Sequence, residues 1–246
     1  MNSPDWLTAQ PVAHRGLHDA ARGIIENTPS SVAAAIAANF AIEVDLQITA
    51  DGEAMMHHDD ELGRLNEGSA RLDAMSATAL RLVRYKTTSD TMISLGELCE
   101  LVAGRVTLVL ELKSHFNGDP RLPLRAAEVL KGYAGPVAVM SFDPSQIAVV
   151  RQAAPGLRRG LVAENKYRPT HQDHGWLRGS ANYLGALWAA RPQFLAYSVR
   201  DLTSPVPRMA RNIAGLPLLT WTVRTPDDRA RAERWADQMF FEGFRP

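Results

Sequence analysis

The sequence lacks a charge excess of either sign. Its 246 residues include 27 basic and 27 acidic side chains, so the formal net charge is zero and no broad positive surface is expected. Nonspecific nucleic-acid binding depends on such a surface, because basic side chains neutralise phosphates and release counterions. We therefore expect no nucleic-acid partner.

Cysteine and long apolar runs are also scarce. The single cysteine, Cys99, excludes an intrachain disulfide, and Leu95, Leu98 and Val102 around it recur at helical spacing, which predicts packing rather than nucleophilic chemistry. No stretch reaches the roughly 18 apolar residues of a membrane span. The first residues have neither the basic start nor the apolar run of a signal peptide. We expect a cytoplasmic protein that does not span a membrane.

What the sequence does contain is a regular alternation of β-rich runs and helical patterns, typical of βα units around a parallel sheet. The expected strands are 11–16, 42–49, 106–112, 137–142, 159–163, 194–199, 218–223 and 238–242. The expected helices are 29–39, 95–103, 122–133, 144–153, 205–213 and 226–236. Eight such units in about 250 residues predict an α/β fold, a (β/α)8 TIM barrel with its functional groups at the C-terminal ends of the strands.

Two features refine this prediction. Thr28, Asp143 and Thr225 each precede a proline, the order expected for a helix N-cap followed by the first helical residue. Residues 59–91, between the second and third expected strands, are irregular and polar, and we interpret them as a small insertion over the barrel mouth. About 30 residues rarely bury a core of their own, so residues 1–246 are expected to form one domain.

Acidic residues alternate along the second expected strand. Glu43 and Asp45 are two positions apart and therefore project from the same strand face, opposite Val44 and Leu46. Two carboxylates facing the barrel interior repel each other unless a cation lies between them, and oxygen ligands suit Mg²⁺ or Ca²⁺ better than zinc. An outward-facing pair, or an ion pair, is the alternative interpretation.

The third expected strand ends with the same spacing, in Glu111 and Lys113. Glu111 can complete a metal site and Lys113 can neutralise a phosphate oxygen, although a simple ion pair between them is the other interpretation. The first expected strand ends in His14, Arg15 and Gly16. Arginine binds phosphoryl oxygens in pairs and histidine transfers protons near neutral pH, so this end suits phosphate chemistry.

Two adjacent histidines, His57 and His58, follow a short apolar run that returns the chain toward the mouth. Neighbouring side chains can face opposite ways, and spacing alone does not choose the catalytic one. Neither of these two histidines belongs to an H-x-x-x-H pair, and a single cysteine cannot form a C-x-x-C pair, so their spacing does not support zinc.

Together these residues resemble the glycerophosphodiester phosphodiesterase family. The ordered matches are His14-Arg15-Gly16, Glu26-Asn27-Thr28, Glu43-x-Asp45, Thr49-x-Asp51-Gly52, His58-Asp59 with Leu62 and Arg64, Glu111-x-Lys113 and, less closely, Trp221-Thr222-Val223. The resemblance departs at Val32, where the family commonly has Phe, and after Phe240, where it commonly has a Thr-Asp-x-Pro segment. The late departure concerns the alcohol part of the substrate more than the reaction.

The resemblance implies a TIM barrel that uses a divalent cation, Mg or Ca, to hydrolyse small-molecule glycerophosphodiesters to glycerol 3-phosphate and an alcohol. It implies metal ligands at Glu43, Asp45 and Glu111. It also implies catalytic histidines at His14 and His58, the latter chosen because Asp59 follows it. Arg15 and Lys113 match phosphate-contacting positions, and Trp221 is a candidate to stack on the glycerol moiety or to line the mouth as a core residue.

Two alternatives stay open from the sequence. A lysophospholipase D-like enzyme would use the same headgroup chemistry behind a more apolar mouth, which residues 59–91 do not favour because they lack a long apolar face. A barrel that binds phosphorylated metabolites without catalysis would have no use for two histidines. The nucleophile, either water or the substrate's own glycerol hydroxyl, is not distinguished.

Overall fold

The computed structural model describes residues 5–165 and 188–246, and within them nine strands form one sheet. They are β1 (Val12–Ala13), β2 (Ala41–Ile48), β3 (Ala54–Met56), β4 (Leu108–Leu112), β5 (Val137–Ser141), β6 (Arg158–Ala163), β7 (Phe194–Ser198), β8 (Leu218–Val223) and β9 (Gln238–Phe241). All eight expected strands are present, and β3 is an additional one.

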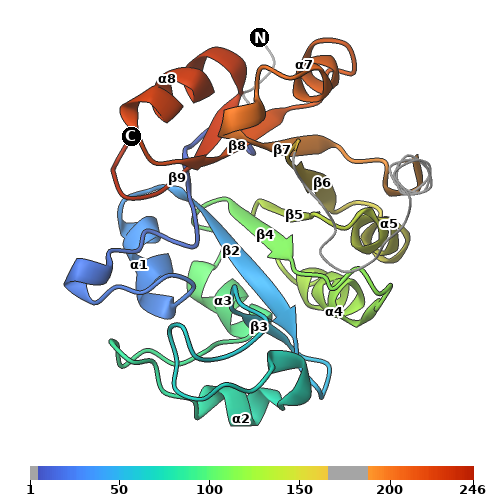
Figure 1. The fold of residues 1–246 in the computed structure, drawn as a ribbon. Coiled ribbons are helices and arrows are strands. Elements are labelled where there is room, and N and C mark those ends of the chain that lie inside the picture. Colours follow the sequence, from blue (N-terminus) through green and yellow to red (C-terminus); the bar gives the residue numbers. More distant parts are fainter. Residues whose placement is uncertain (1–4, 166–187) are drawn as a thin grey trace.

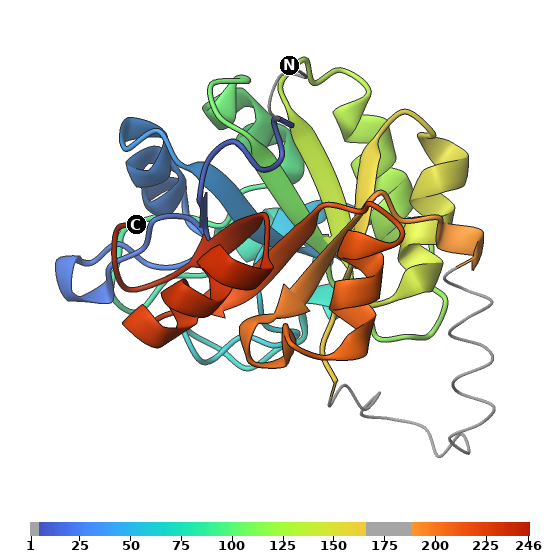
Figure 2. The ribbon, with the colours of Figure 1, turned by 90° about the horizontal axis from the view of Figure 1, so that it is seen from above.

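The sheet closes into a barrel. Eight strands pair in parallel, and β1 pairs with both β2 and β9, so that Val12 lies opposite Ala41 on one side and Phe240 on the other. β3 runs antiparallel to the C-terminal half of β2. This closed parallel ring, with helices around it in Figures 1 and 2, confirms the (β/α)8 prediction.

All six expected helices are present, and each begins within one residue of its expected start. Together with the additional helix α2, the helices that lie entirely within the described residues are α1 (Pro29–Ala37), α2 (Ala77–Arg81), α3 (Leu95–Val102), α4 (Arg121–Leu130), α5 (Pro144–Ala153), α7 (Pro205–Asn212) and α8 (Pro226–Trp235), with 3-10 turns η1 (Ala20–Arg22), η2 (Leu72–Ala74) and η3 (Val199–Asp201). Thr28, Asp143 and Thr225 each accept a hydrogen bond from a first-turn backbone N–H, with proline next. Among the helices of the described residues, none has the length and apolarity that crossing a membrane requires.

Apolar side chains fill the interior of the barrel. One buried cluster takes residues from all eight barrel strands: Val12, Ala41, Val109, Ala138, Met140, Val162, Phe194, Ala196, Leu219 and Phe240. Gly160 leaves room for the Phe194 ring, because a Cβ there would lie 2.4 Å from it. A second, larger cluster joins the outer faces of the strands to the helices. Inward-facing polar residues further along β2 and β4 are therefore left at the mouth.

The insertion has short elements that its composition does not predict, η2 and α2, and Figure 1 shows α2 beside the C-terminal end of β2. Its apolar side chains Leu62, Leu72 and Leu80 cluster with Ile25 and Met55, which lie outside the insertion. Because this cluster needs residues from both parts of the chain, we propose that the insertion and the barrel form one domain.

Cys99 on α3 offers a direct test of the helix packing. Burial, with a smaller contribution from Glu100, raises the pKa of its thiol to about 11. The thiol is then protonated at about pH 8, and only the thiolate reacts. We expect iodoacetamide to alkylate Cys99 about 100-fold more slowly in the native protein than in concentrated urea, where the pKa returns toward that of free cysteine. Equal rates would contradict the packing.

Candidate active site

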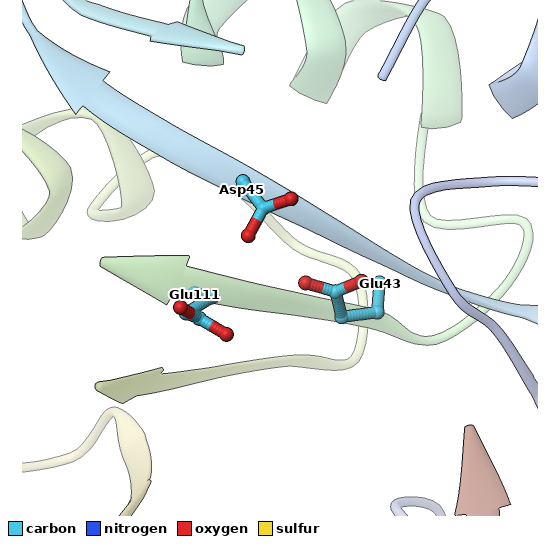
Figure 3. A group of neighbouring side chains, drawn as sticks. All are labelled: Glu43, Asp45 and Glu111. Atoms are coloured by element: carbon cyan, nitrogen blue, oxygen red, sulfur yellow. The ribbon is translucent and has the colours of Figure 1, made fainter. Parts of the chain in front are cut away.

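Three carboxylates gather at the mouth of the barrel. Glu43 and Asp45 lie on β2 and Glu111 on β4, and Asp45 is paired in register with Glu111. One oxygen from each lies within 4.8 Å of the others, and Figure 3 shows the three side chains pointing toward one another. The acids on β2 therefore face the same side of the strand, as their alternation predicts, because odd-numbered positions of a strand share one face.

The three acids are buried, with exposed fractions of 1% for Glu43, 1% for Asp45 and 8% for Glu111. Lys113 Nζ donates to Asp45 Oδ1 at 2.8 Å and to Glu111 Oε1 at 2.7 Å, so the Glu111–Lys113 ion pair, the alternative interpretation of the sequence, is present among the three carboxylates. Burial would raise the pKa of Asp45, but Lys113, His58 and Arg15 lower it far below its usual value.

Arg15 lies against the same group because the chain turns sharply after β1. Arg15 and Gly16 have φ values of 57° and 78°, which end β1 at Ala13 and correct the expected strand 11–16. A Cβ on Gly16 would lie 2.4 Å from a Ser31 oxygen, so only glycine fits. The Arg15 backbone N–H donates to Glu43 Oε2 at 2.9 Å, and its Nε lies 3.5 Å from Asp45 Oδ2.

Glu43 carries the unbalanced charge of this group. Three carboxylates face two cationic side chains, Lys113 and Arg15, so one negative charge is uncompensated when all are ionised. Burial and then repulsion from Asp45 and Glu111 raise the pKa of Glu43 well above its usual value. Its Oε1 is buried without a hydrogen-bond partner among the described residues.

These observations fit a divalent cation. The donor set is three carboxylates, the ligand type that Mg²⁺ and Ca²⁺ prefer, and one of their oxygens is buried without a partner. A cation there would also offset the excess negative charge. Glu43, Asp45 and Glu111 are therefore the residues that would hold it.

His14 is held by a residue that the sequence analysis missed. Its Nδ1 lies 3.0 Å from Glu242 Oε2 and its Nε2 lies 3.9 Å from Glu43 Oε2. Hydrogen bonds from His14 and Arg224 lower the pKa of Glu242 to about 2 although burial raises it. An ionised carboxylate only accepts hydrogen bonds, so His14 carries its proton on Nδ1 when neutral and presents Nε2 to the site.

His58 has the same arrangement, and His57 does not. His58 Nδ1 lies 2.7 Å from Asp59 Oδ1, and the side chain is 30% exposed. His57 is 1% exposed, and neither of its ring nitrogens has a hydrogen-bond partner among the described residues. Burial lowers the pKa of His57 to about 4, so it is neutral at physiological pH. The structure thus orients only one of the two adjacent histidines with a carboxylate.

Asn27 is a second residue whose place the sequence analysis did not interpret. Its Nδ2 donates to Asp45 Oδ2 at 2.8 Å and its Oδ1 accepts from the Asp45 backbone N–H at 3.1 Å. These two bonds hold the carboxylate from both its side chain and its main chain. The Glu26-Asn27-Thr28 motif was the available signal, but it gave no partner.

Trp221 lies on β8 and is anchored in the barrel. Its Nε1 donates to the Ala196 carbonyl at 3.2 Å, and its ring packs edge-to-face on Phe142 with centroids 5.5 Å apart. It contacts the apolar cluster inside the barrel. This placement fits a residue that lines the mouth, and stacking on a substrate stays a prediction.

The fold and the mouth together describe a barrel enzyme with acid–base groups beside a candidate cation site. A sequence model of the glycerophosphoryl diester phosphodiesterase family matches residues 14–241, and the chain belongs to this family.

Known relatives agree with this assignment. Glycerophosphodiester phosphodiesterase 1 from Bos taurus is 25% identical over 253 residues, covering 90% of this chain and 74% of that protein. Among solved structures, the glycerophosphodiester phosphodiesterase from Thermotoga maritima matches with a TM-score of 0.71 and 20% identity over 94% of each chain. A phosphodiesterase from Oleispira antarctica, in complex with the product sn-glycerol-3-phosphate, matches with a TM-score of 0.75 and 21% identity, covering 94% of this chain and 92% of that one. The two structures share the fold of this chain.

Proposed function

We propose that this protein hydrolyses glycerophosphodiesters to glycerol 3-phosphate and an alcohol, with a divalent cation, Mg²⁺ or Ca²⁺, and with His14 and His58 as proton-transfer groups. One observation carries the proposal. Beside a buried group of three carboxylates, two histidines each have Nδ1 on a carboxylate, His14 on Glu242 and His58 on Asp59.

Binding of the phosphodiester follows from the charges at the mouth. When bound, a divalent cation supplies Lewis-acid stabilisation of the negative charge on the phosphate oxygens. Glu43, Asp45 and Glu111 would hold it. Arg15 and Lys113 then contact the non-bridging oxygens and offset charge that grows on them in the transition state.

The two histidines move the protons. One accepts the proton of the attacking hydroxyl as its oxygen bonds to phosphorus, and the other donates a proton to the leaving oxygen as its bond to phosphorus breaks. With water as nucleophile, glycerol 3-phosphate and the alcohol form directly. With the substrate's own glycerol hydroxyl, a cyclic phosphate forms first and water then opens it.

The substrate class rests on family membership and on the names of the relatives, which are glycerophosphodiester phosphodiesterases. The product sn-glycerol-3-phosphate that the Oleispira antarctica enzyme binds is the product proposed for this chain. In this proposal Trp221 at the mouth packs against the glycerol moiety.

The two alternatives are less well supported. A lysophospholipase D-like activity would need an apolar mouth, but the large apolar side chains of the insertion are buried or partly buried in their own cluster, with Leu82 as the exposed exception. A non-catalytic binder would have no need for histidines whose tautomers are set by carboxylates.

A direct assay tests the proposal. Metal-stripped protein is incubated with glycerophosphocholine or glycerophosphoethanolamine, Mg²⁺, Ca²⁺ or Mn²⁺ is added back separately, and glycerol 3-phosphate is detected with a coupled dehydrogenase. We expect product only after a cation is restored. Faster turnover of lysophosphatidylcholine would favour the lysophospholipase alternative. Calorimetric binding of a diester without product would favour the binder.

A further inference from the structure

A continuous line of ionic hydrogen bonds joins the two sides of the candidate site. His58 Nδ1 lies 2.7 Å from Asp59 Oδ1, and Asp59 Oδ2 accepts from Arg64 Nε at 2.6 Å. Arg64 Nη2 in turn donates to Glu26 Oε1 at 2.7 Å, and the same oxygen accepts from Arg15 Nη1 at 2.7 Å. His58 and Arg15 lie at the two ends of this line of hydrogen bonds. Arg64 is the link between them.

Arg64 bridges the carboxylates of Asp59 and Glu26 through a single guanidinium. Its Nε and Nη2 lie on one planar guanidinium and reach two different carboxylates at the same time. A lysine ammonium is a single point charge and cannot reproduce that fixed spacing. Both bonds are short and charge-assisted, and hydrogen bonds from Arg64 and His58 lower the pKa of Asp59 to about 2 although burial raises it.

We propose that Arg64 is a positioning residue, supplied by the insertion, that orients His58 through Asp59 and Arg15 through Glu26. The proposal rests on the proposed roles of His58 and Arg15. It also gives the insertion a function, because residues 59–91 provide the connection between a proton-transfer group and a phosphate-binding group.

Each arm of Arg64 has its own effect. Asp59, held by Arg64, keeps the proton of neutral His58 on Nδ1 and leaves Nε2 for proton transfer, so this arm acts on the chemical step. Glu26 holds Arg15 Nη1 and thereby sets the direction of the guanidinium, so this arm acts on substrate binding. A misplacement of about 1 Å in such groups can cost about 100-fold in rate.

Steady-state kinetics separate the two arms. We expect Asp59→Asn to lower kcat with little change in KM, and Glu26→Gln to raise KM with little change in kcat. Arg64→Ala is expected to do both, with kcat/KM reduced by about 10- to 100-fold. Arg64→Lys should recover only part of the loss. In double variants, Arg64→Ala should change kcat little further once Asp59 is Asn, and KM little further once Glu26 is Gln.

Arg71→Ala is the matched control. Arg71 belongs to the same insertion, its side chain is 43% exposed against 45% for Arg64, and it pairs with Asp73 through the same two nitrogens. Loss of a surface arginine as such would affect both variants equally. Equal kinetics for Arg64→Ala and Arg71→Ala, or fully additive double variants, would overturn the proposal.

A measurement without turnover keeps the inference separate from the proposed function. In ¹⁵N-histidine NMR spectra, neutral His58 is expected as the Nδ1–H tautomer in the wild type and in Arg71→Ala, and as a mixture in Arg64→Ala. An unchanged tautomer in Arg64→Ala would overturn the orientation of His58 even if hydrolysis is confirmed. The expected spectra in a protein without hydrolytic activity would instead refute the proposed function alone.

Discussion

His58→Gln is expected to lower kcat for glycerophosphodiester hydrolysis by about 10²- to 10⁴-fold, the usual contribution of a general acid or base. The glutamine keeps a polar side chain of similar reach, but it cannot gain and lose a proton at neutral pH. His14→Gln is expected to have an effect of the same order. Steady-state kinetics under saturating cation measure both losses.

Two controls show whether this loss is chemical. Affinity for the cation should stay unchanged in both variants, because neither histidine is among the three proposed ligands Glu43, Asp45 and Glu111. His57→Gln should keep kcat near the wild-type value, since His57 is buried and its ring nitrogens make no hydrogen bond to the described residues of the candidate site. Wild-type turnover in both His14→Gln and His58→Gln would remove the histidines from the mechanism.

Glu43→Gln is expected to have opposite effects on activity and on stability. It removes one of three candidate ligands, so cation-dependent activity should be lost. The stabilisation that a cation gives the wild type, about 2.7 kcal/mol at 100 times its dissociation constant, should disappear as well. In metal-free protein the same change relieves repulsion from Asp45 and Glu111. We expect a gain of about 1 kcal/mol there, which is about 2–4 °C in Tm for a domain of this size.

Thermal unfolding with and without added cation, in parallel with a metal titration, measures this reversal. Glu100→Gln on the exposed side of α3 removes the same charge far from the mouth and should change neither quantity. An unchanged cation-induced Tm shift in Glu43→Gln would exclude Glu43 as a ligand. A large loss of metal-free stability would show that its carboxylate is needed for folding.

The parts of the site on β2 and β4 could be predicted because strand geometry is periodic. Glu43, Asp45 and Glu111 occupy alternate positions of neighbouring parallel strands, so their sequence spacing sets their common face. The helix starts at Thr28, Asp143 and Thr225 were predictable for a similar reason, since N-capping is a local interaction.

Other parts depend on contacts that no local pattern contains. The expected strand 11–16 contains only Val12–Ala13, because the positive φ of Arg15 serves contacts with β2. Glu242 follows the last strand and has no distinguishing neighbours, and its role is visible only when the barrel closes. The two elements of the insertion, η2 and α2, pack around apolar residues of distant segments, which hydrophobic periodicity over so few residues does not reveal.

The pairing of β1 with β9 has a consequence for the order of synthesis. His14 and Glu242 are separated by 228 positions, and the His14 backbone N–H also donates to the Phe241 carbonyl at 3.1 Å. During synthesis Glu242 follows His14 by 228 positions, so the carboxylate partner of His14 is added only after the other barrel strands have been translated. The orientation of the His14 ring therefore depends on the last strand of the barrel. We expect a nascent chain that still lacks β9 and Glu242 to be inactive.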